Sequence, residues 1–308
     1  MMRSLYSAIT GLKNEQISMD VIGNNIANVN TAGYKRQRAS FSSMLGQQIR
    51  GASAPKTDDI TGLVTCGGTN GVSIGLGSIL GSVDKLMGQG SSQYTGKATD
   101  MMIQGEGMFI LNSSGKDFYT RTGNFDFDEA GNLIDSSSGA LVQGYTNGAV
   151  ETAGTPPTIA AANWGAATAI GGINFQLGQQ LAIDNTYKLK SYSIGQDGII
   201  TGVYSDGTNS VTKPLYKIAL ATFPNEGGLT AEGNNYYTVS NNSGAADVGA
   251  PGASARGMII PNYLEMSNVD LSQEFTDMIV TQRGFQANSR VITVSDTLLQ
   301  ELIDLKRN

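Results

Sequence analysis

The stretch that decides the fold is LSQEFTDMIVTQRGFQANSRVITVSDTLLQELIDL, which spans residues 271–305. Its large apolar side chains recur every seven residues, at Leu271, Met278, Phe285, Ile292 and Leu299. This spacing is typical of a helix with one apolar stripe, which Phe275 joins early and Leu302 joins late. At ~1.5 Å per residue the helix would be about 52 Å long, with Asp270 or Ser272 as its N-cap.

A second apolar stripe lies at the other end of the chain. Leu5, Leu12, Met19 and Ile26 are also seven residues apart, and Ile9 supplies an interleaved position. They predict a helix over residues 3–27, roughly 38 Å long. An Asn- and Gly-rich cluster then ends this helix, because these residues favour caps and turns. Neither helix has much reason to be stable alone, since helical order in proteins comes mainly from packing such a stripe.

The two stripes indicate a surface for association. They must be buried against each other, against further copies of the chain, or both. One alternative is a helix pair that is complete in the monomer. The small, neutral polar residues that flank both stripes favour contacts with additional helices. We predict a subunit interface that is made of apolar residues from both stripes: Leu5, Ile9, Leu12, Met19, Ile26, Leu271, Phe275, Met278, Phe285, Ile292, Leu299 and Leu302.

The fold class is predicted to be α+β and multi-domain. Residues 1–30 and 268–308 form a terminal, coiled-coil-like helical domain, with the intervening chain held to one side. Residues 31–70 are predicted to be an extended connector, because frequent glycines prevent a long helix. Short apolar runs between turn signals predict a mainly antiparallel β-domain that contains residues 71–145 and 187–267.

Two hairpins are expected within this β-domain. One joins residues 101–103 to 108–111 across a Gly-containing turn, and the other joins residues 125–128 to 133–134. Residues 146–186 lack a clear period, and we interpret them as a short insertion.

The composition argues against an enzyme. The chain has no histidine, the side chain that most often acts as general base or metal ligand near neutral pH. Its single cysteine, Cys66, excludes an intramolecular disulfide, and we interpret it as an incidental loop thiol or a covalent link to a neighbouring subunit. Residues 126–131 match a calcium loop only in part, and residues 75–81 miss the dinucleotide-binding spacing. We expect no catalytic residue, no metal and no cofactor.

Charge is sparse and mildly uneven. Residues 1–50 hold six basic and two acidic side chains, and residues 270–308 hold four basic and six acidic ones, so their opposite net charges slightly favour pairing. No block of Lys and Arg indicates nucleic acid binding. The chain contains no stretch of 18 apolar residues, so we expect no membrane insertion. The N-terminus lacks the apolar run of a cleavable secretory signal.

Both ends of the chain closely resemble the axial flagellar proteins, the family of rod, hook and hook-associated subunits. The N-terminal resemblance is carried by SLYSAITGL at residues 4–12 and MDVIGNNIANVNTAGYK at residues 19–35. The C-terminal resemblance is carried by LEMSNVDL at residues 264–271 and MIVTQRGFQANS at residues 278–289. Stretches within residues 99–125 and 195–229 resemble the first β-domain of the family.

Within the family, NVDLSQEF at residues 268–275 and LQELIDLK at residues 299–306 are most similar to hook proteins. The resemblance implies a structural subunit of the flagellar hook, a flexible helical tube outside the cell that passes motor torque to the filament. The alternative is the distal rod subunit of the basal body. Implied partners are further copies of the chain, the rod and hook–filament junction proteins, the hook cap during assembly and the type III export apparatus. The insertion at residues 146–186 is too short for the large second β-domain of longer hook proteins.

Two other classes compete with a polymer subunit, namely an enzyme and a monomeric extracellular adhesin. An adhesin predicts that both ends of the chain are ordered in a dilute monomer. A polymer subunit predicts that proteolysis of the dilute monomer trims both ends and leaves a core of roughly residues 70–265.

Overall fold

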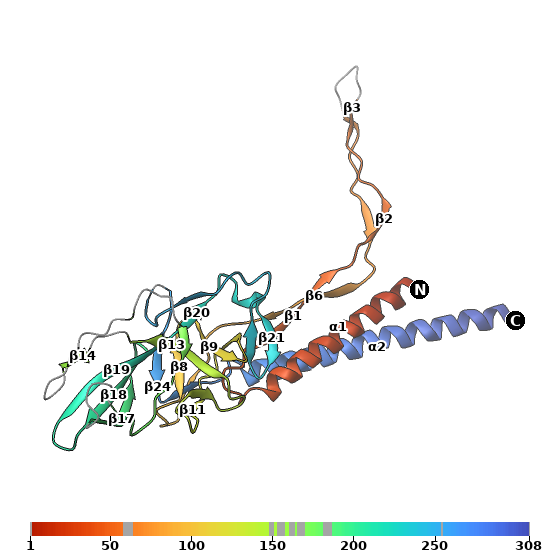
Figure 1. The fold of residues 1–308 in the computed structure, drawn as a ribbon. Helices are drawn as coiled ribbons and strands as arrows, with labels where there is room; N and C mark the ends of the chain where they lie inside the picture. Colours follow the sequence, from red (N-terminus) through yellow and green to blue (C-terminus); the bar gives the residue numbers. More distant parts are fainter. Residues whose placement is uncertain are drawn as a thin grey trace. The chain divides into compact units, whose positions relative to one another are not determined.

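The computed structural model describes residues 2–57, 64–147, 151–152, 158–159, 164, 170–180, 187–253 and 255–307. The chain, which Figure 1 colours from its N-terminus to its C-terminus, divides into two units. Unit 1 contains Met1–Ala27, Gln37–Lys85 and Asp270–Asn308, and unit 2 contains Asn28–Arg36 and Leu86–Val269. The chain therefore passes from one unit to the other four times.

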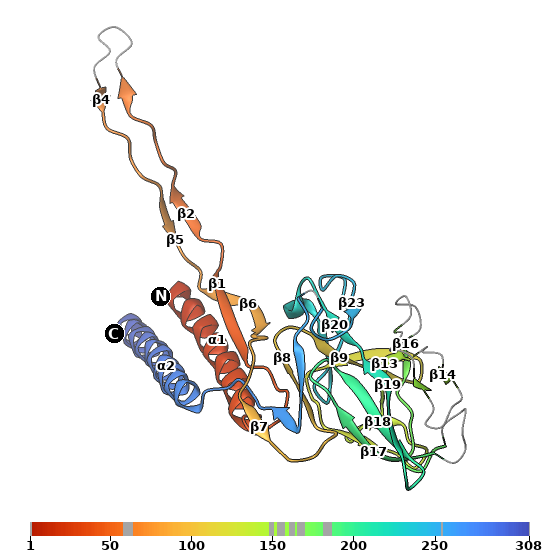
Figure 2. The same ribbon diagram turned by 90° about the vertical axis from the view of Figure 1, so that its left-hand side faces the viewer.

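Unit 1 is built on two helices from opposite ends of the chain, α1 (Met2–Ala27) and α2 (Leu271–Arg307). They run antiparallel and side by side, so that the start of α1 and the end of α2 lie at the same end of the pair (Figures 1 and 2). Asp270 caps α2, because its Oδ1 accepts hydrogen bonds from the backbone N–H groups of Ser272 and Gln273 at 2.8 and 3.4 Å. Both predicted helices are confirmed.

The rest of unit 1 is a long, two-stranded antiparallel ribbon (Figure 2). The residues that were predicted to be an extended connector contribute much of its first arm. Its paired strands are β1 (Gln37–Ser43) with β6 (Ser78–Lys85), β2 (Gln47–Arg50) with β5 (Val72–Ile74), and β3 (Lys56–Thr57) with β4 (Val64–Cys66).

Unit 2 is the β-rich part of the chain. Its elements are β7 (Ser92–Tyr94), β8 (Met101–Gln104), β9 (Met108–Ser113), β10 (Lys116–Thr120), β11 (Phe125–Phe127), β12 (Leu133–Asp135), β13 (Leu141–Thr146), β14 (Glu151–Thr152), β15 (Thr158–Ile159), β16 (Ile170–Gly172), β17 (Lys188–Ile194), β18 (Ile199–Ser205), β19 (Ser210–Ile218), β20 (Leu220–Thr222), the 3₁₀ turn η1 (Glu226–Gly228), β21 (Thr230–Gly233), β22 (Tyr236–Thr238), β23 (Asp247–Gly249), β24 (Met258–Pro261) and β25 (Tyr263–Glu265).

The main sheet of unit 2 has the order β17-β18-β19-β13-β9-β10-β22-β21, with antiparallel neighbours. Strands β11, β12, β16, β20 and β23 attach to it beside this path, while β8 pairs with β24 and β7 pairs with β25. The predicted class, terminal helices with a mainly antiparallel β-domain, is confirmed.

The core of unit 2 lies on both faces of the main sheet. Along β9, Phe109 and Leu111 pack into one apolar cluster and Met108 and Ile110 pack into another, because successive side chains of a strand point to opposite faces. The rings of Phe109 and Phe125 meet edge to face at 5.1 Å between centroids. The unbroken apolar run of β9 thus reflects burial on both sides.

One predicted hairpin is confirmed and one is wrong. Strands β11 and β12 pair across a turn in which Asp128 Oδ1 accepts the backbone N–H of Asn132 at 2.7 Å. Strands β8 and β9 do not pair with each other, since β8 pairs with β24 and β9 pairs with β10, β13 and β20. Gly105 and Gly107 have φ values of 111° and 127°, outside the left-handed helical values of a tight hairpin turn, so they redirect the chain.

The predicted insertion at residues 146–186 lies largely outside the described residues. Its described parts include the pair β14 and β15 and the strand β16, which pairs with β13. The side chain of Cys66 lies outside the described residues as well. Its two interpretations therefore stay predictions.

Candidate subunit interface

The contact between α1 and α2 follows one antiparallel register, in which Gly11 faces Asn288 and Glu15 faces Gly284. A Cβ atom at Gly11 would lie 2.7 Å from Asn288 Nδ2, and one at Gly284 would lie 2.6 Å from Glu15 Oε1. Both glycines therefore allow a close approach that a larger residue would obstruct.

The seam between the two helices contains buried polar side chains as well as the buried apolar residues Ala8 and Ile22. Asn25 and Glu274 are 1% and 0% exposed, and Asn25 Nδ2 donates to Glu274 Oε2 at 3.2 Å. Asn25 also binds the backbone of Gln37 at the start of β1, donating to its carbonyl at 2.8 Å and accepting from its N–H at 3.0 Å. Thr281 and Ser295 lie at heptad spacing from Glu274 and are buried too. We call Asn25, Gln37 and Glu274 the unit 1 clamp.

The predicted interface residues fall into two groups. The half-buried group contains Leu5, Leu12, Met19, Ile26, Met278, Ile292 and Leu299. The exposed group, with 37–51% of each residue accessible, contains Ile9, Leu271, Phe275, Phe285 and Leu302. The helix pair thus leaves much of its apolar stripe uncovered. The role of these residues in assembly stays a prediction.

A second apolar stripe lies on α2, in addition to the one that begins at Leu271. It consists of side chains three or four residues apart that are 43–74% exposed: Val291, Val294, Leu298, Leu302 and Leu305. In the register given by Gly11 and Asn288, α1 begins roughly level with Thr297. The last turns of α2, with their exposed leucines, therefore extend beyond the start of α1 (Figure 1).

The ribbon of unit 1 also exposes apolar side chains. Ile49 on β2 and Val72 and Ile74 on β5 are exposed, as is Leu45 between β1 and β2. A two-stranded sheet without a covering layer is marginally stable in water. Unit 1 therefore presents uncovered apolar surface on two different elements, the outer side of α2 and the ribbon.

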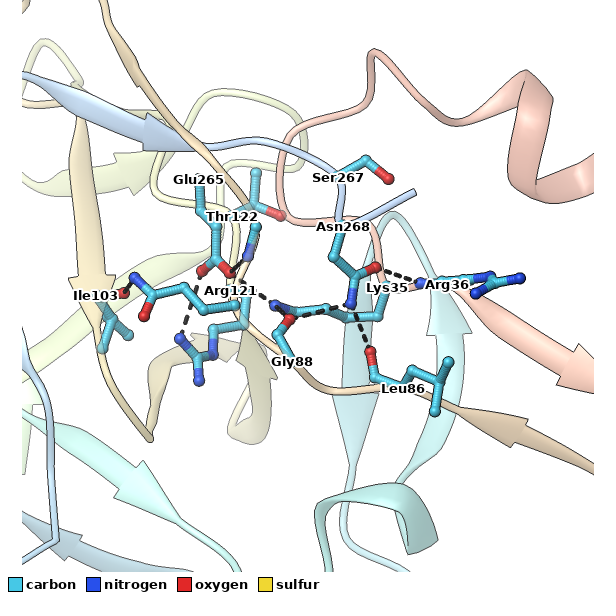
Figure 3. A network of polar contacts seen from close by, with 12 residues as sticks. Lys35, Arg36, Leu86, Gly88, Ile103, Arg121, Thr122, Glu265, Ser267 and Asn268 are labelled. Carbon is cyan, nitrogen blue, oxygen red and sulfur yellow. Dashed lines mark hydrogen bonds and ion pairs between the residues drawn. The ribbon is translucent and has the colours of Figure 1, made fainter. Parts of the chain in front are cut away.

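Unit 2 contains a buried polar network where the chain enters and leaves it (Figure 3). Lys35 Nζ donates to Glu265 Oε1 at 2.7 Å and to the Gly88 carbonyl at 2.9 Å, and both charged side chains are almost inaccessible. Glu265 also accepts from Arg121 Nη1 at 3.4 Å and from the Gly90 backbone N–H at 2.9 Å. The buried carboxylate is thus paired and hydrogen-bonded, as a charge in a low-dielectric interior must be.

Asn268 extends this network. Its Oδ1 accepts from the Arg36 backbone N–H at 2.7 Å, and its Nδ2 donates to the carbonyls of Leu86 and Gly88 at 2.8 and 3.0 Å (Figure 3). We call Lys35, Arg121, Glu265 and Asn268, with their backbone partners, the unit 2 clamp.

Burial dominates the protonation of this region. It lowers the pKa of Lys35 below its ordinary value, and the Glu265 carboxylate offsets part of the effect. Burial also raises the pKa of Glu226, against the attraction of Arg121 and Lys35. Both shifts follow from the cost of keeping a charge away from water.

Three family descriptions match the chain: flagella basal body rod protein at residues 5–35, flagellar hook protein FlgE/F/G D1 domain at residues 102–202, and flagellar basal body rod FlgEFG protein C-terminal at residues 260–305. The flagellar basal-body rod protein FlgG of Bacillus subtilis is 41% identical over 308 residues, which cover both chains completely. The chain belongs to the flagellar rod and hook protein family.

Other members of the rod and hook family are similar along the whole chain. FlgG of Caulobacter vibrioides, also a basal-body rod protein, is 36% identical over 306 residues, with 99% of this chain and all of the relative covered. The flagellar hook protein FlgE of Borreliella burgdorferi is 32% identical over 451 residues, with 99% of this chain and all of the relative covered. The predicted resemblance is confirmed, and the chain is a structural subunit of the flagellar axis.

Among the residues that the structure describes, no group of three His, Cys, Asp or Glu side chains is placed to hold a metal ion. No helix in this part of the chain is long and apolar enough to cross a membrane.

The buried polar contacts of the two clamps were not predicted from the sequence. Lys35, Glu265 and Asn268 lie in stretches that resemble the flagellar family, but the Lys35–Glu265 pair joins residues 230 positions apart. A one-dimensional pattern does not reveal such a pair. A signal for the helix contact was present, since Gly11 and Gly284 stand inside predicted helices, where glycine costs ~1 kcal/mol relative to alanine.

Proposed function

We propose that the chain is a subunit of the bacterial flagellar hook, which self-assembles through its terminal helices into a flexible helical tube that transmits motor torque to the filament. The observation that best supports this proposal is the contrast between the polar side chains buried in the seam of the helix pair and the exposed apolar residues around it. Phe275 and Phe285 face solvent in a lone subunit, whereas Asn25 and Glu274 are buried in the seam. Exposed apolar patches of this kind mark interaction surfaces.

An open helical array requires two different patches that meet between copies, because a patch that meets itself closes into a dimer. Unit 1 offers the outer side of α2 and the ribbon as two such patches. A flexible tube also needs weak contacts in its outer layer. The low charged fraction of 15%, with abundant neutral polar residues, suits small and wet contacts between β-rich units.

The partners that we propose follow from this position in the flagellum. They are further copies of the chain, the rod at one end of the hook, the hook–filament junction proteins at the other, the cap during growth and the type III export apparatus.

Concentration-dependent assembly of the purified chain tests the proposal. Sedimentation across increasing protein concentration should show a cooperative transition from monomer to polymer, and electron microscopy should show curved tubes. A chain that remains monomeric at every concentration, with both helices protected from proteolysis, would contradict it.

The distal rod is the second candidate, and one observation favours it. The FlgG relatives align with this chain over 306–308 residues and match its length, whereas the FlgE relatives align over 451–473 residues. The shape of the polymer distinguishes the two positions. Straight, stiff tubes would favour the rod, and curved, flexible tubes would favour the hook.

A further inference from the structure

The chain passes between its two units as four single strands, after Ala27, Arg36, Lys85 and Val269. No more than four residues separate each of these crossings from a polar group of one of the clamps. Asn25 precedes the first crossing and Arg36 and Gln37 flank the second. Leu86 follows the third, and Asn268 and Glu274 flank the fourth.

Within unit 1, the clamp joins three crossing segments. The Asn25 amide, near the end of α1, holds both backbone groups of Gln37, where β1 begins. The same amide donates to Glu274 in the first turn of α2. Gln37 is in turn paired with Lys85, the last residue of β6. One buried side chain therefore ties α1, α2 and the ribbon together where each of them begins or ends.

Within unit 2, the other clamp joins the continuing segments. Asn268 links the Arg36 N–H to the Leu86 carbonyl, and the Leu86 N–H donates to the Arg36 carbonyl at 2.8 Å. Lys35 and Glu265 add a buried ion pair beside these bonds. Gly90 lies so close to the Met266 carbonyl that no Cβ fits between them.

We propose that the two clamps are a mechanical coupling device, which holds the crossing strands of each unit together so that tension along one strand is shared by the others. This inference rests on the proposed function as a torque-transmitting subunit. Without the clamps, each crossing would be a single extended strand that peels from its unit alone. With them, separating a strand requires several hydrogen bonds to break together.

The chemistry of the unit 2 clamp suits resistance to rupture better than it suits equilibrium stability. A buried ion pair contributes little net stability, because desolvation offsets its attraction. Breaking it, however, leaves an uncompensated buried charge on each side, which is strongly unfavourable. Rupture under force is governed by the unfolding rate, which such a barrier slows.

Single-molecule pulling on the monomer tests this device without requiring tube formation. Handles at the two chain ends deliver tension to unit 2 through Asn28 and Val269. Handles on S114C and T208C, in a C66S background, pull unit 2 through its β9–β10 and β18–β19 turns and bypass the clamps. The test variants are N268A, which removes only neutral hydrogen bonds, and K35M/E265Q, which removes the buried Lys35–Glu265 ion pair.

At constant force, both variants should shorten the lifetime of unit 2 about tenfold or more when it is pulled from the chain ends. Pulled through the two turns, the same variants should keep nearly the wild-type lifetime. F109L, which weakens the core but not the clamp, should shorten the lifetime in both geometries. Two results would overturn the proposal. In one, N268A and K35M/E265Q shorten the lifetime equally in both pulling geometries; in the other, they leave the lifetime unchanged when unit 2 is pulled from the chain ends. Either result leaves the assembly assay for the proposed function unaffected.

Discussion

The two units bury their apolar residues in opposite ways. In unit 2 the strand β9 is covered on both faces, and Phe109, Leu111 and Met108 are inaccessible to solvent. In unit 1 the polar residues Asn25 and Glu274 are buried in the seam beside Ile22, while many large apolar residues remain exposed. Unit 2 therefore has the core of an independent domain, and unit 1 has half of a core whose other half we expect other copies to supply.

The largest expected effect comes from charging the uncovered stripe. We expect F285D to abolish assembly, because an unpaired carboxylate would be buried between copies. Unit 2 should unfold at the same temperature as in the wild type, since Phe285 is exposed in the lone subunit. Sedimentation and thermal unfolding measure the two outcomes. Q282D, which places the same charge at an exposed polar position of α2, is the matched control, and normal tubes from F285D would remove the stripe from the interface.

The converse change in unit 2 should have the opposite pattern. F109A removes a ring that is fully buried against Phe125 and should lower the stability of unit 2 by about 3–5 kcal/mol. Denaturant unfolding measures the loss. L302A, a truncation of an exposed side chain on α2, should leave the unfolding of the monomer unchanged while it weakens assembly. A similar loss of monomer stability in both variants would contradict the division into a complete and an incomplete core.

A smaller effect is expected at the start of α2. D270A removes the carboxylate that accepts the N–H groups of Ser272 and Gln273, which should cost ~1 kcal/mol of local helix stability. Hydrogen exchange of these two amides should accelerate, and amides of unit 2 should not change. S272A tests the other predicted cap and should behave like the wild type. Equal acceleration in both variants would reassign the cap.

The smallest effect concerns the pH dependence of unit 2. Burial raises the folded-state pKa of Glu226 above the unfolded value of about 4.5, so its contribution to stability is complete below that pH. This contribution is lost as pH rises through the folded-state pKa. E226Q should therefore raise Tm at pH 7 by at most ~4 °C, with no difference from the wild type below pH 4.5.

E232Q is the matched control for this measurement. Lys116 lowers the pKa of the exposed Glu232 carboxyl. The pH dependence of its contribution to stability is therefore opposite to that of Glu226: it is present above the ordinary pKa and is lost as pH falls. A lower Tm for E226Q at pH 7 would show that the charged form of Glu226 is favoured in the folded state.

Sequence patterns were sufficient where a feature repeats at short range. The seven-residue spacing from Leu271 onward predicted α2, and the turn after Phe127 predicted the pairing of β11 with β12. The failed hairpin between β8 and β9 shows the limit, because the true partner of β8 is β24, more than 150 residues further along the chain. Both strands are apolar and short, so only the packed sheet decides which neighbour each takes.

The interface was likewise predictable only in part. The heptad positions did carry apolar residues, but the periodicity did not tell which of them face the partner helix. Gly11 and Gly284 set a backbone separation at which polar residues fit the seam, and this distance depends on both helices together. The clamps escaped prediction for the same reason, since Lys35 and Glu265 lie 230 positions apart in the chain.

The antiparallel helix pair has a practical consequence for anyone who labels this protein. The first residue of α1 and the last residue of α2 lie at the same end of the pair, beside the uncovered leucines of α2 (Figure 1). An affinity tag or fluorescent fusion at either terminus would therefore crowd one and the same docking region. The exposed turn at Gly207, where a Cβ atom would meet open space, offers a more tolerant place for an inserted epitope.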